Sequence, residues 1–380
     1  MQIQSIRWAL PTLFLRICLV PLSLAGICTF SFAASTDGAI FVLARDVSLS
    51  DGLPVRNLSG DWKQGYDPKE PNPRALRSTQ FQIGWRGIGG DYSLIERKEA
   101  FLAMSADTAT LLSQYQQKSS PLVPSTNRSA QSHFLGWHGR GFEWQTKSFD
   151  IQNTQLQLTA QGFRLLALRQ YETQGSWGTD GQGGYDYDVQ AHDEDSRQSI
   201  PPGVTSWGAP SSQGWGWSLS LGLTHRFNEA HTLRLNATDA ISQLRWSGVT
   251  AQDERLNSSI KARNSEGYID YAASVTGRYS SADALAKIPA AWSGQWLWEV
   301  NPSWETSITW SERFGIQQRW LAADYRADSI RWGFGIEPIR QGKKLAVGHQ
   351  YWQASLAWDQ ASASTGKLLS WGLMVAIPIK

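Results

Sequence analysis

The residues that could carry chemistry are charged side chains spaced along alternating segments in the second half of the chain. In these segments every second residue is apolar, so the charged residues between them share the opposite face of an extended strand. If the apolar face points outward, eight charged side chains point inward: Arg226, Asp270, Arg278, Glu299, Glu305, Arg313, Arg331 and Glu337. Acidic and basic side chains that face each other could line a pore. They would then set the electric field across the pore and the largest solute that can pass. They could equally form a salt-bridge network that fills and stiffens the interior.

A second group of candidates lies in the segment 174–213, which has no alternation and is rich in Gly, Ser, Pro, Asp and Tyr. This composition predicts a long surface loop. Clustered carboxylates on such a loop could bind Ca²⁺ or bridge divalent ions on lipopolysaccharide. The candidate ligands are Asp180, Asp186, Asp188 and Asp193. Their spacing matches no established calcium loop, and a solvated acidic loop that binds no metal is the simpler interpretation. We therefore expect no cofactor.

Catalysis would need a nucleophile or activated water beside an organised base. The chain has six histidines. No G-x-S-x-G, H-E-x-x-H or G-x-x-x-x-G-K motif surrounds them. His138 or His192 could still meet a distant serine and aspartate in the folded chain, which leaves a hydrolase as a minor hypothesis. We expect a protein that is not an enzyme.

The clearest single element is the stretch 215–227. Trp215, Leu219 and Leu223 fall on one parity, and small or polar residues fall on the other. This pattern is typical of a strand with one apolar face, of the length that crosses a bilayer at a tilt. The polar residues 228–230 predict a short turn after it. Farther along the chain, the apolar residues change from odd-numbered to even-numbered positions. This change predicts a β-bulge at 238–240.

The N-terminal residues 1–33 are predicted to be a signal peptide. Arg7 and Arg16 provide the positive flank, an apolar stretch follows, and 31–33 forms a small-x-small cleavage site. Both cysteines of the chain, Cys18 and Cys28, lie in this segment, so the mature chain would contain no disulfide. Its removal also balances acidic against basic residues, and no basic excess remains to suggest a nucleic-acid partner.

Tryptophan is unusually abundant, with 20 residues beside 11 Tyr and 13 Phe. Barrels in a bilayer place aromatic rings at both water interfaces, where an apolar ring and a polar N–H or O–H group each find a suitable neighbour. A tryptophan-rich soluble sandwich or a carbohydrate-binding protein would be the alternative.

The alternating segments predict an all-β protein, a transmembrane antiparallel up-and-down β-barrel of about fourteen strands, within about twelve to sixteen. The barrel is predicted over 80–380, with the long outer loop 174–213. The irregular segment 34–79 is expected to be a periplasmic lead or a plug in the lumen. Residues 94–117 fit a strand or an amphipathic helix, a turn is predicted at 139–141, and a polar loop is predicted at 247–266.

With these features the chain resembles Gram-negative outer-membrane β-barrel proteins as a class. The resemblance rests on the predicted signal peptide, the alternating strands and the closing strand 369–379. It implies a location in the bacterial outer membrane, with outer-membrane lipid, lipopolysaccharide and the barrel assembly machinery as partners. The chain ends with Ile377, Pro378, Ile379 and Lys380 where the class usually ends on an aromatic residue.

Two functions follow as hypotheses. The first is a porin-like channel or transporter that passes a small solute through a lumen lined by the eight charged residues. The second is a surface adhesin, receptor or scaffold that acts through its outer loops, with the barrel serving as its anchor. The cargo, the state of the lumen and the oligomeric state do not follow from the sequence.

Overall fold

The computed structural model of the 380-residue chain describes residues 38–55, 72–117, 125–179, 185–197, 213–263, 269–360 and 366–379. The predicted signal peptide (1–33) lies outside these residues. So do 56–71 and the candidate ligand Asp180.

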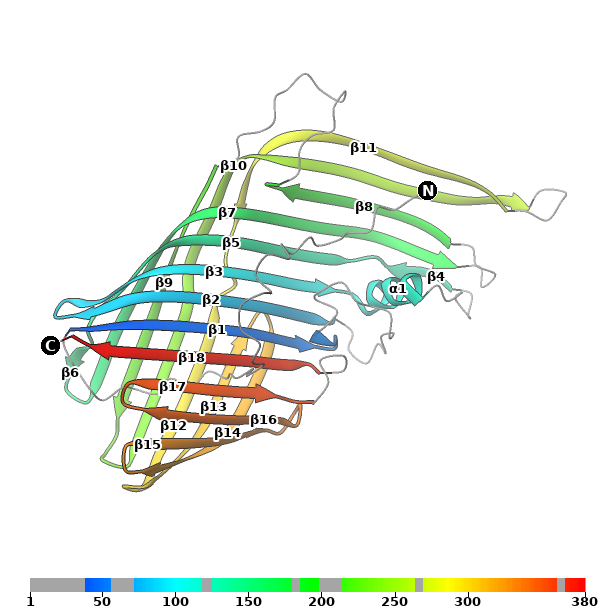
Figure 1. Ribbon diagram of the computed structural model, residues 1–380. Coiled ribbons are helices and arrows are strands. Elements are labelled where there is room, and N and C mark those ends of the chain that lie inside the picture. The colour runs from blue at the N-terminus through cyan, green and yellow to red at the C-terminus, as the bar shows by residue number, and fades with distance from the viewer. Residues whose placement is uncertain are drawn as a thin grey trace, which may run out of the picture.

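The described chain is almost entirely β-structure (Figure 1). Its first strands are β1 (Ala39–Asp51), β2 (Arg74–Gly87), β3 (Gly90–Met104), β4 (Ser125–Ser129), β5 (Ser132–Gln145), β6 (Phe149–Ile151), β7 (Thr154–Thr179), β8 (Tyr185–Asp195) and β9 (Gln213–Arg226). They are followed by β10 (His231–Arg263), β11 (Ile269–Ala286), β12 (Ala291–Asn301), β13 (Trp304–Arg313), β14 (Ile316–Ala327), β15 (Ile330–Glu337), β16 (Gly342–His349), β17 (Trp352–Trp358) and β18 (Leu368–Pro378). One helix, α1 (Ala106–Gln117), follows β3. Among the described residues, no helix is long and apolar enough to cross a membrane.

The strands close into an antiparallel barrel because β1 pairs with β2 on one edge and with β18 on the other. The wall has fourteen strand positions, in the order β1, β2, β3, β5, β7, β9, β10, β12, β13, β14, β15, β16, β17 and β18. β8 continues the position of β9 between β7 and β10. β11 continues the position of β12 beside β10. The predicted fold class and the predicted number of strands are both confirmed.

The barrel begins earlier than the sequence predicted. β1 lies within the segment expected to be a periplasmic lead or a plug, yet it is a wall strand. Alternation is weak here because both faces of β1 carry apolar side chains. Phe41 is buried on the inner face, whereas Ile40 is exposed on the outer face. The expected boundary at residue 80 is therefore wrong for 39–51, and β2 begins at Arg74.

Three predicted irregular segments are partly or wholly strand. β5 runs without a turn through 139–141. β10 extends to Arg263, through most of the predicted loop 247–266. β7 continues to Thr179 and β8 occupies 185–195, within the predicted loop 174–213. These strand ends project beyond the shorter strands β12 to β18 (Figure 1). Polar side chains stand on both of their faces, so the two-residue pattern is lost there.

Other local predictions are confirmed. The helix α1 occupies the second half of the segment that fits both periodicities, after β3. The register between β9 and β10 shifts between Ala237 and Ile241, where the bulge was predicted. At the predicted turn after β9, Asn228 Oδ1 accepts hydrogen bonds from the backbone N–H groups of Ala230 and His231 at 2.9 and 2.8 Å.

The two ends of the barrel differ. The end that holds the Asn228 turn also holds the start of β1, the end of β18 and the short β2–β3 connection. We call it the turn end. The opposite, long-segment end holds α1 and the projecting parts of β7, β8, β10 and β11 (Figure 1). Short turns at one end and long segments at the other are the asymmetry of outer-membrane barrels.

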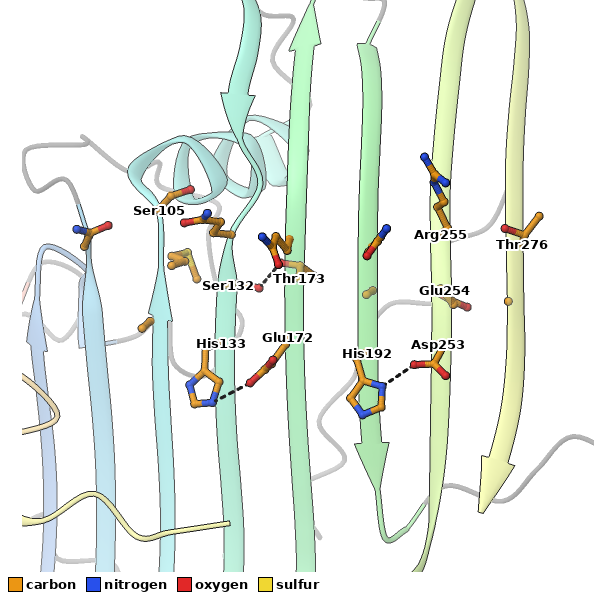
Figure 2. A pocket seen from close by; sticks show the side chains of 18 of the residues that line it. Ser105, Ser132, His133, Glu172, Thr173, His192, Asp253, Glu254, Arg255 and Thr276 are labelled. Carbon is orange, nitrogen blue, oxygen red and sulfur yellow. Dashed lines mark hydrogen bonds and ion pairs between the residues drawn. The ribbon is translucent and has the colours of Figure 1, made fainter. Parts of the chain in front are cut away.

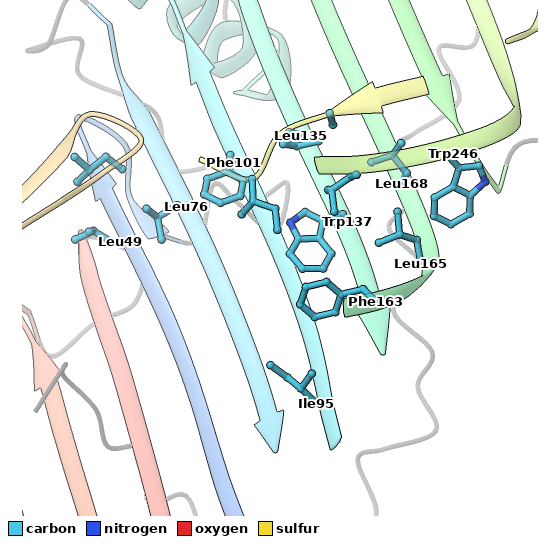
Figure 3. Close-up of a cluster of buried hydrophobic side chains, with 14 of the residues drawn as sticks. Leu49, Leu76, Ile95, Phe101, Leu135, Trp137, Phe163, Leu165, Leu168 and Trp246 are labelled. Carbon is cyan, nitrogen blue, oxygen red and sulfur yellow. The ribbon is translucent and has the colours of Figure 1, made fainter. Parts of the chain in front are cut away.

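Apolar side chains occur on both faces of the wall, in different places. Large apolar residues form an exposed outer belt that includes Ile83, Phe142, Leu219, Ile308 and Phe334. A separate buried cluster fills the interior toward the long-segment end; Figure 3 shows part of it, including Phe101, Leu135, Trp137, Leu168 and Trp246. The belt is the surface that a bilayer would cover, and the inner cluster closes the lumen like the core of a soluble protein.

Candidate functional site

Four charged side chains meet inside the barrel and form what we call the lumen cluster: Arg97, Glu99, Asp239 and Arg313. β3 supplies Arg97 and Glu99, two residues apart and therefore on the same inner face. The bulge in β10 supplies Asp239, whose φ is 53°. The end of β13 supplies Arg313. Three segments far apart in the sequence thus contribute to one site.

Each arginine of the lumen cluster binds both carboxylates. Arg97 Nη2 donates to Glu99 Oε1 at 2.8 Å and also to Asp239 Oδ2, and Arg97 Nη1 donates to Asp239 Oδ1 at 2.8 Å. Arg313 Nη1 and Nη2 donate to the two oxygens of Glu99 at 2.8 and 3.0 Å, and Nη2 donates to Asp239 Oδ2 at 3.0 Å. The side chains of Arg97, Glu99 and Asp239 are at most 1% exposed. Two cations and two anions therefore balance in a largely buried space, in which only Arg313 is partly exposed.

Polar neighbours complete the hydrogen bonding of the lumen cluster. Ser78 Oγ donates to Glu99 at 2.8 Å, and Arg97 Nη1 donates to Gln161 Oε1 at 2.9 Å. Arg313 Nε donates to the backbone carbonyl of Pro289 at 3.2 Å. Buried charges are tolerated only when they are paired and their remaining hydrogen-bonding atoms are satisfied, and this site meets both conditions.

Apolar side chains cover the lumen cluster on the side of the long-segment end. The Arg97 guanidinium lies 5.4 Å from the ring centroid of Trp137, and that of Arg313 lies 5.1 Å from Phe101. Ile288, from the connection between β11 and β12, is buried in the same layer. Its backbone is held by Ser242, whose Oγ accepts from Ile288 N at 2.9 Å and donates to Ile288 O at 3.0 Å. The apolar layer and the lumen cluster together close this level of the barrel.

The lumen on the side of the turn end contains small polar cavities. One of about 30 Å³ is lined by Gln295, Thr309 and Trp320 among others, and a neighbouring one of about 20 Å³ shares these three residues. Arg331 there binds Glu305 and, at 3.1 Å, Asp324. A cavity needs roughly 10–15 Å³ of such volume for one water molecule, so each of these spaces holds only about one to three waters.

Beyond the apolar layer, the projecting strands enclose a much larger hollow of about 980 Å³, which we call the vestibule. Its lining includes His133 of β5, Glu172 of β7, His192 of β8, Asp253 of β10 and Arg278 of β11. Figure 2 shows the first four side chains on neighbouring strands, and the hydrogen bond between His192 and Asp253. The vestibule is open to solvent, unlike the cavities near the turn end.

The charges of the vestibule are paired but exposed. Asp253 accepts from His192 Nδ1 at 2.7 Å and from Arg278 Nε at 3.0 Å. The hydrogen bond to Asp253 raises the pKa of His192, and the nearby carboxylate of Glu194 adds to this effect. The hydrogen bond from His192, followed by that from Arg278, lowers the pKa of Asp253. Arg255 binds Asp188 at 3.0 Å on the same face. The vestibule therefore presents exposed polar groups of both signs to a solute.

The eight charged residues predicted to line the lumen do not form one site. Arg313 belongs to the lumen cluster, and Glu305 and Arg331 form the ion pair near the turn end. Arg278 lies in the vestibule. Arg226 and Glu299 are exposed at the turn end. Glu337 is fully buried and accepts a hydrogen bond from the backbone N–H of Arg340 at 2.6 Å, so it fixes the connection after β15. Asp270 lies in β11, but its side chain is outside the described part.

The described part of the proposed metal site brings no ligand cluster together. Asp186 and Asp188 share one face of β8, whereas Asp193 lies on the other. Asp188 is paired with Arg255, and Asp193 with Arg169 at 2.7 Å. Within the described residues, no group of three or more His, Cys, Asp and Glu side chains could hold a metal ion.

Sequence reasoning missed three members of the lumen cluster. Arg97 and Glu99 lie in the segment that also fitted a helix, so no inner face could be assigned to them. Asp239 lies inside the predicted bulge, where parity is undefined. The predicted bulge was nevertheless a signal, because a bulge can re-aim a side chain, and an acidic residue within it is a candidate for an inward-facing charge. The apolar residues that suggested it have another cause: Leu244 and Trp246 are buried in the inner cluster, whereas Ile241 stays on the same outer face as Leu235.

Closed strand pairing, an outer apolar belt and a polar interior define the chain as a β-barrel of the outer-membrane class, which confirms the predicted resemblance at this level. No protein-family model and no curated protein matches the chain.

Several solved barrels align along most of its length. The CymD monoaromatic hydrocarbon channel aligns with a TM-score of 0.38 and 12% identity over 93% of this chain and 92% of that chain. The P. putida toluene transporter TodX aligns with a TM-score of 0.37 and 9% identity over 90% and 88%. A Pseudomonas aeruginosa FadL homologue aligns with a TM-score of 0.39 and 10% identity over 90% and 89%. The class assignment rests on the strand pairing and the apolar belt, not on these alignments.

Proposed function

We propose that this protein is a gated transporter for a small solute in the bacterial outer membrane, with the vestibule facing the outside. The lumen cluster, lying between the vestibule and the narrow lumen of the turn end, is the observation that carries the proposal. The vestibule would admit a solute, and the lumen cluster with its apolar cover would be the closed gate. A permanently open porin fits less well, because the described cavities beyond the gate hold only a few waters each.

The chemistry of the gate supports a switch between two arrangements. Arg313 is the most exposed member of the lumen cluster, at 14%, and lies at the end of β13. If Arg313 moved away, Arg97 could neutralise only one of the two carboxylates, so the open arrangement would be less stable and the closed gate would be the resting state. The solutes that fit are small and polar, because charged groups line the vestibule and polar groups line the lumen near the turn end.

A second function is favoured by one feature, the height of the wall on one side. β10 spans 33 residues and β7 spans 26, whereas β15 and β16 span eight each. The projecting sheet could serve as a receptor or scaffold surface, with the filled barrel as its anchor. In that case the lumen cluster would only stiffen the barrel.

Single-channel conductance in planar bilayers separates the two functions. The informative variant is Glu99→Gln with Arg313→Gln, because it removes one anion and one cation and leaves the Arg97–Asp239 pair balanced. We expect a higher open probability than in the wild type, about tenfold for each 1.4 kcal/mol by which the closed state is weakened. The matched control is Asp46→Asn with Arg77→Gln, which removes an ion pair of 2.8 Å on the outer face.

The control should behave like the wild type. If neither the wild type nor the lumen-cluster variant carried current above the bare bilayer, while both ran as folded barrels on unheated gels, the gate proposal would be overturned and the receptor function favoured.

A further inference from the structure

The outer face of the barrel carries a row of basic side chains that crosses adjacent strands in register. The pairing registers place Glu96 opposite Arg140, Arg140 opposite Arg164, Arg164 opposite Trp215, and Trp215 opposite Arg245. These residues come from β3, β5, β7, β9 and β10, which are adjacent wall strands. Five segments separated by long stretches of sequence thus build one line across the wall, which we call the arginine row.

The arginine row faces outward and not into the lumen. Its members alternate with inner-face residues, such as Arg97 beside Glu96 and Gly141 beside Arg140. The side chain of Arg140 is 65% exposed, and that of Arg245 is 55% exposed. Arg164 is exposed as well. Lys98, two residues beyond Glu96 on β3, adds a further exposed cation on the same face.

The arginine row carries more positive charge than its neighbours neutralise. Glu96 is shared by Lys98 at 3.0 Å and Arg140 at 2.8 Å. Arg245 approaches Asp283 only at 3.8 Å. Arg164 has no hydrogen bond or ion pair within the described part of the chain, although it lies directly opposite Arg140. Like charges directly opposite each other on neighbouring strands are destabilising, and a bound anion would remove this cost.

The position of the row beside the apolar belt indicates which anion it would bind. Immediately toward the turn end, the same outer face becomes apolar: Leu94 follows Glu96, Phe142 follows Arg140, and Leu219 lies beyond Trp215. All three are among the large exposed hydrophobic residues of the outer belt. The arginine row therefore marks the rim of the belt nearer the long-segment end. In a bilayer that covered the belt, lipid phosphates would lie along this rim.

We propose that the arginine row binds the phosphate groups of a phosphorylated lipid whose acyl chains lie on the apolar belt. Guanidinium groups recognise phosphate with two parallel hydrogen bonds, and Arg140 and Arg164 stand on adjacent strands, which lie about 4.8 Å apart. One phosphate could be held between them, and Arg245 could take a second. This site is independent of the gate and would exist in a barrel that transports nothing.

Native mass spectrometry of the detergent-solubilised full-length protein, titrated with diphosphorylated lipid A, tests the site. The variant Arg140→Gln with Arg164→Gln should retain the lipid at least tenfold more weakly than the wild type. The wild type should bind the dephosphorylated form of the same lipid at least tenfold more weakly than the phosphorylated form. Arg140→Lys with Arg164→Lys, which keeps the charge but loses the planar fork, should fall between the wild type and the glutamine variant.

The matched control is Arg226→Gln with Arg326→Gln, which removes two exposed arginines at the turn end and should leave lipid retention unchanged. All variants should show the mobility shift of a folded barrel on unheated gels. Equal retention by the wild type and the Arg140/Arg164 variant would overturn the proposal, as would equal loss in the control variant or no preference for the phosphorylated lipid.

Discussion

Arg97 and Asp239 are 142 residues apart in the chain, and a two-pronged hydrogen bond joins them inside the barrel. This contact ties β3 to β10, two strands that do not pair with each other through their backbones. It depends on the bulge, because only the φ of 53° at Asp239 turns this side chain toward the lumen. The lumen cluster is therefore a cross-brace as well as a barrier.

The first prediction concerns Asp239→Asn, which removes one negative charge while keeping the shape and the left-handed backbone that Asn tolerates well. Two arginines would then share a single carboxylate in a largely buried site. Leaving a buried charge without its partner costs about 3–5 kcal/mol. Denaturant unfolding in detergent should show a loss of stability of this order.

The comparison is Asp46→Asn, which breaks the exposed outer-face pair with Arg77. Exposed pairs contribute about 0–1 kcal/mol, so this variant should unfold almost like the wild type. Equal losses for Asp46→Asn and Asp239→Asn would contradict the role of the lumen cluster as a buried brace.

A second prediction concerns Gly141 in β5. A Cβ atom at Gly141 would stand 1.7 Å from the backbone oxygen of Gly162 in β7, whereas a Cβ at Gly162 would meet nothing within 4 Å. Because backbone cannot move aside without breaking the ladder, Gly141→Ala should destabilise the barrel by at least about 1–3 kcal/mol. Gly162→Ala should change stability by no more than about 0.5 kcal/mol.

The fraction of protein that shifts on unheated gels measures this difference. A normal yield of folded Gly141→Ala would show that β5 and β7 do not approach each other as closely as described.

Much of the fold could be predicted because a barrel wall between lipid and lumen imposes a two-residue period on every strand. The period held for β9 and for β12 to β15, where lipid-facing and lumen-facing side chains differ in polarity. It failed for β1, whose two faces are both apolar, and for the projecting parts of β7, β8 and β10, whose two faces both meet water. The predicted strand number agreed because two losses offset two gains. β1 was missed and β16 and β17 were predicted as one strand over 345–358, while β5 and the β11–β12 position were each predicted as two strands.

The candidate site was less predictable. The strand face on which a residue lies can be inferred from its neighbours in the sequence, whereas the contacts between distant strands cannot. Parity indicated that Arg313 and Arg331 point inward, and they do. It could not tell that Arg313 meets residues of β3 and β10, since that depends on barrel closure and strand tilt. Arg140, Arg164 and Arg245 show the same limit, because their alignment across the wall follows from pairing registers that a single sequence does not contain.

A third prediction tests the orientation of the barrel. The segment expected to remain after removal of residues 1–33 has no cysteine, so single cysteines can be labelled cleanly. On intact cells, Arg278→Cys at the vestibule should react with a maleimide carried on a large, membrane-impermeant polyethylene glycol. Glu229→Cys in the Asn228 turn should react only after the cells are broken. The reverse pattern would place the vestibule in the periplasm.

The fourth prediction follows from His192, which faces Glu172 of β7, Glu194 of β8, Asp253 of β10 and, beyond Asp253, Arg278 of β11. Its Nδ1–H donates to Asp253 at 2.7 Å, and this bond raises the pKa of His192 above its ordinary value of 6.5. A raised pKa in the folded state means that the tie between β8 and β10 is at full strength below about pH 6.5. It is lost as the pH rises through the higher, folded-state value.

NMR titration of the imidazole should therefore give a midpoint above 6.5 in the wild type and a lower midpoint in Asp253→Asn, which removes the main partner. Asp46→Asn, far from the vestibule, should leave the midpoint unchanged. Amide hydrogen exchange in β8 should become faster as the pH rises through the titration of His192, beyond the general base-catalysed increase seen in β15. An unshifted midpoint in the wild type would mean that His192 and Asp253 are too mobile in solution to hold this bond.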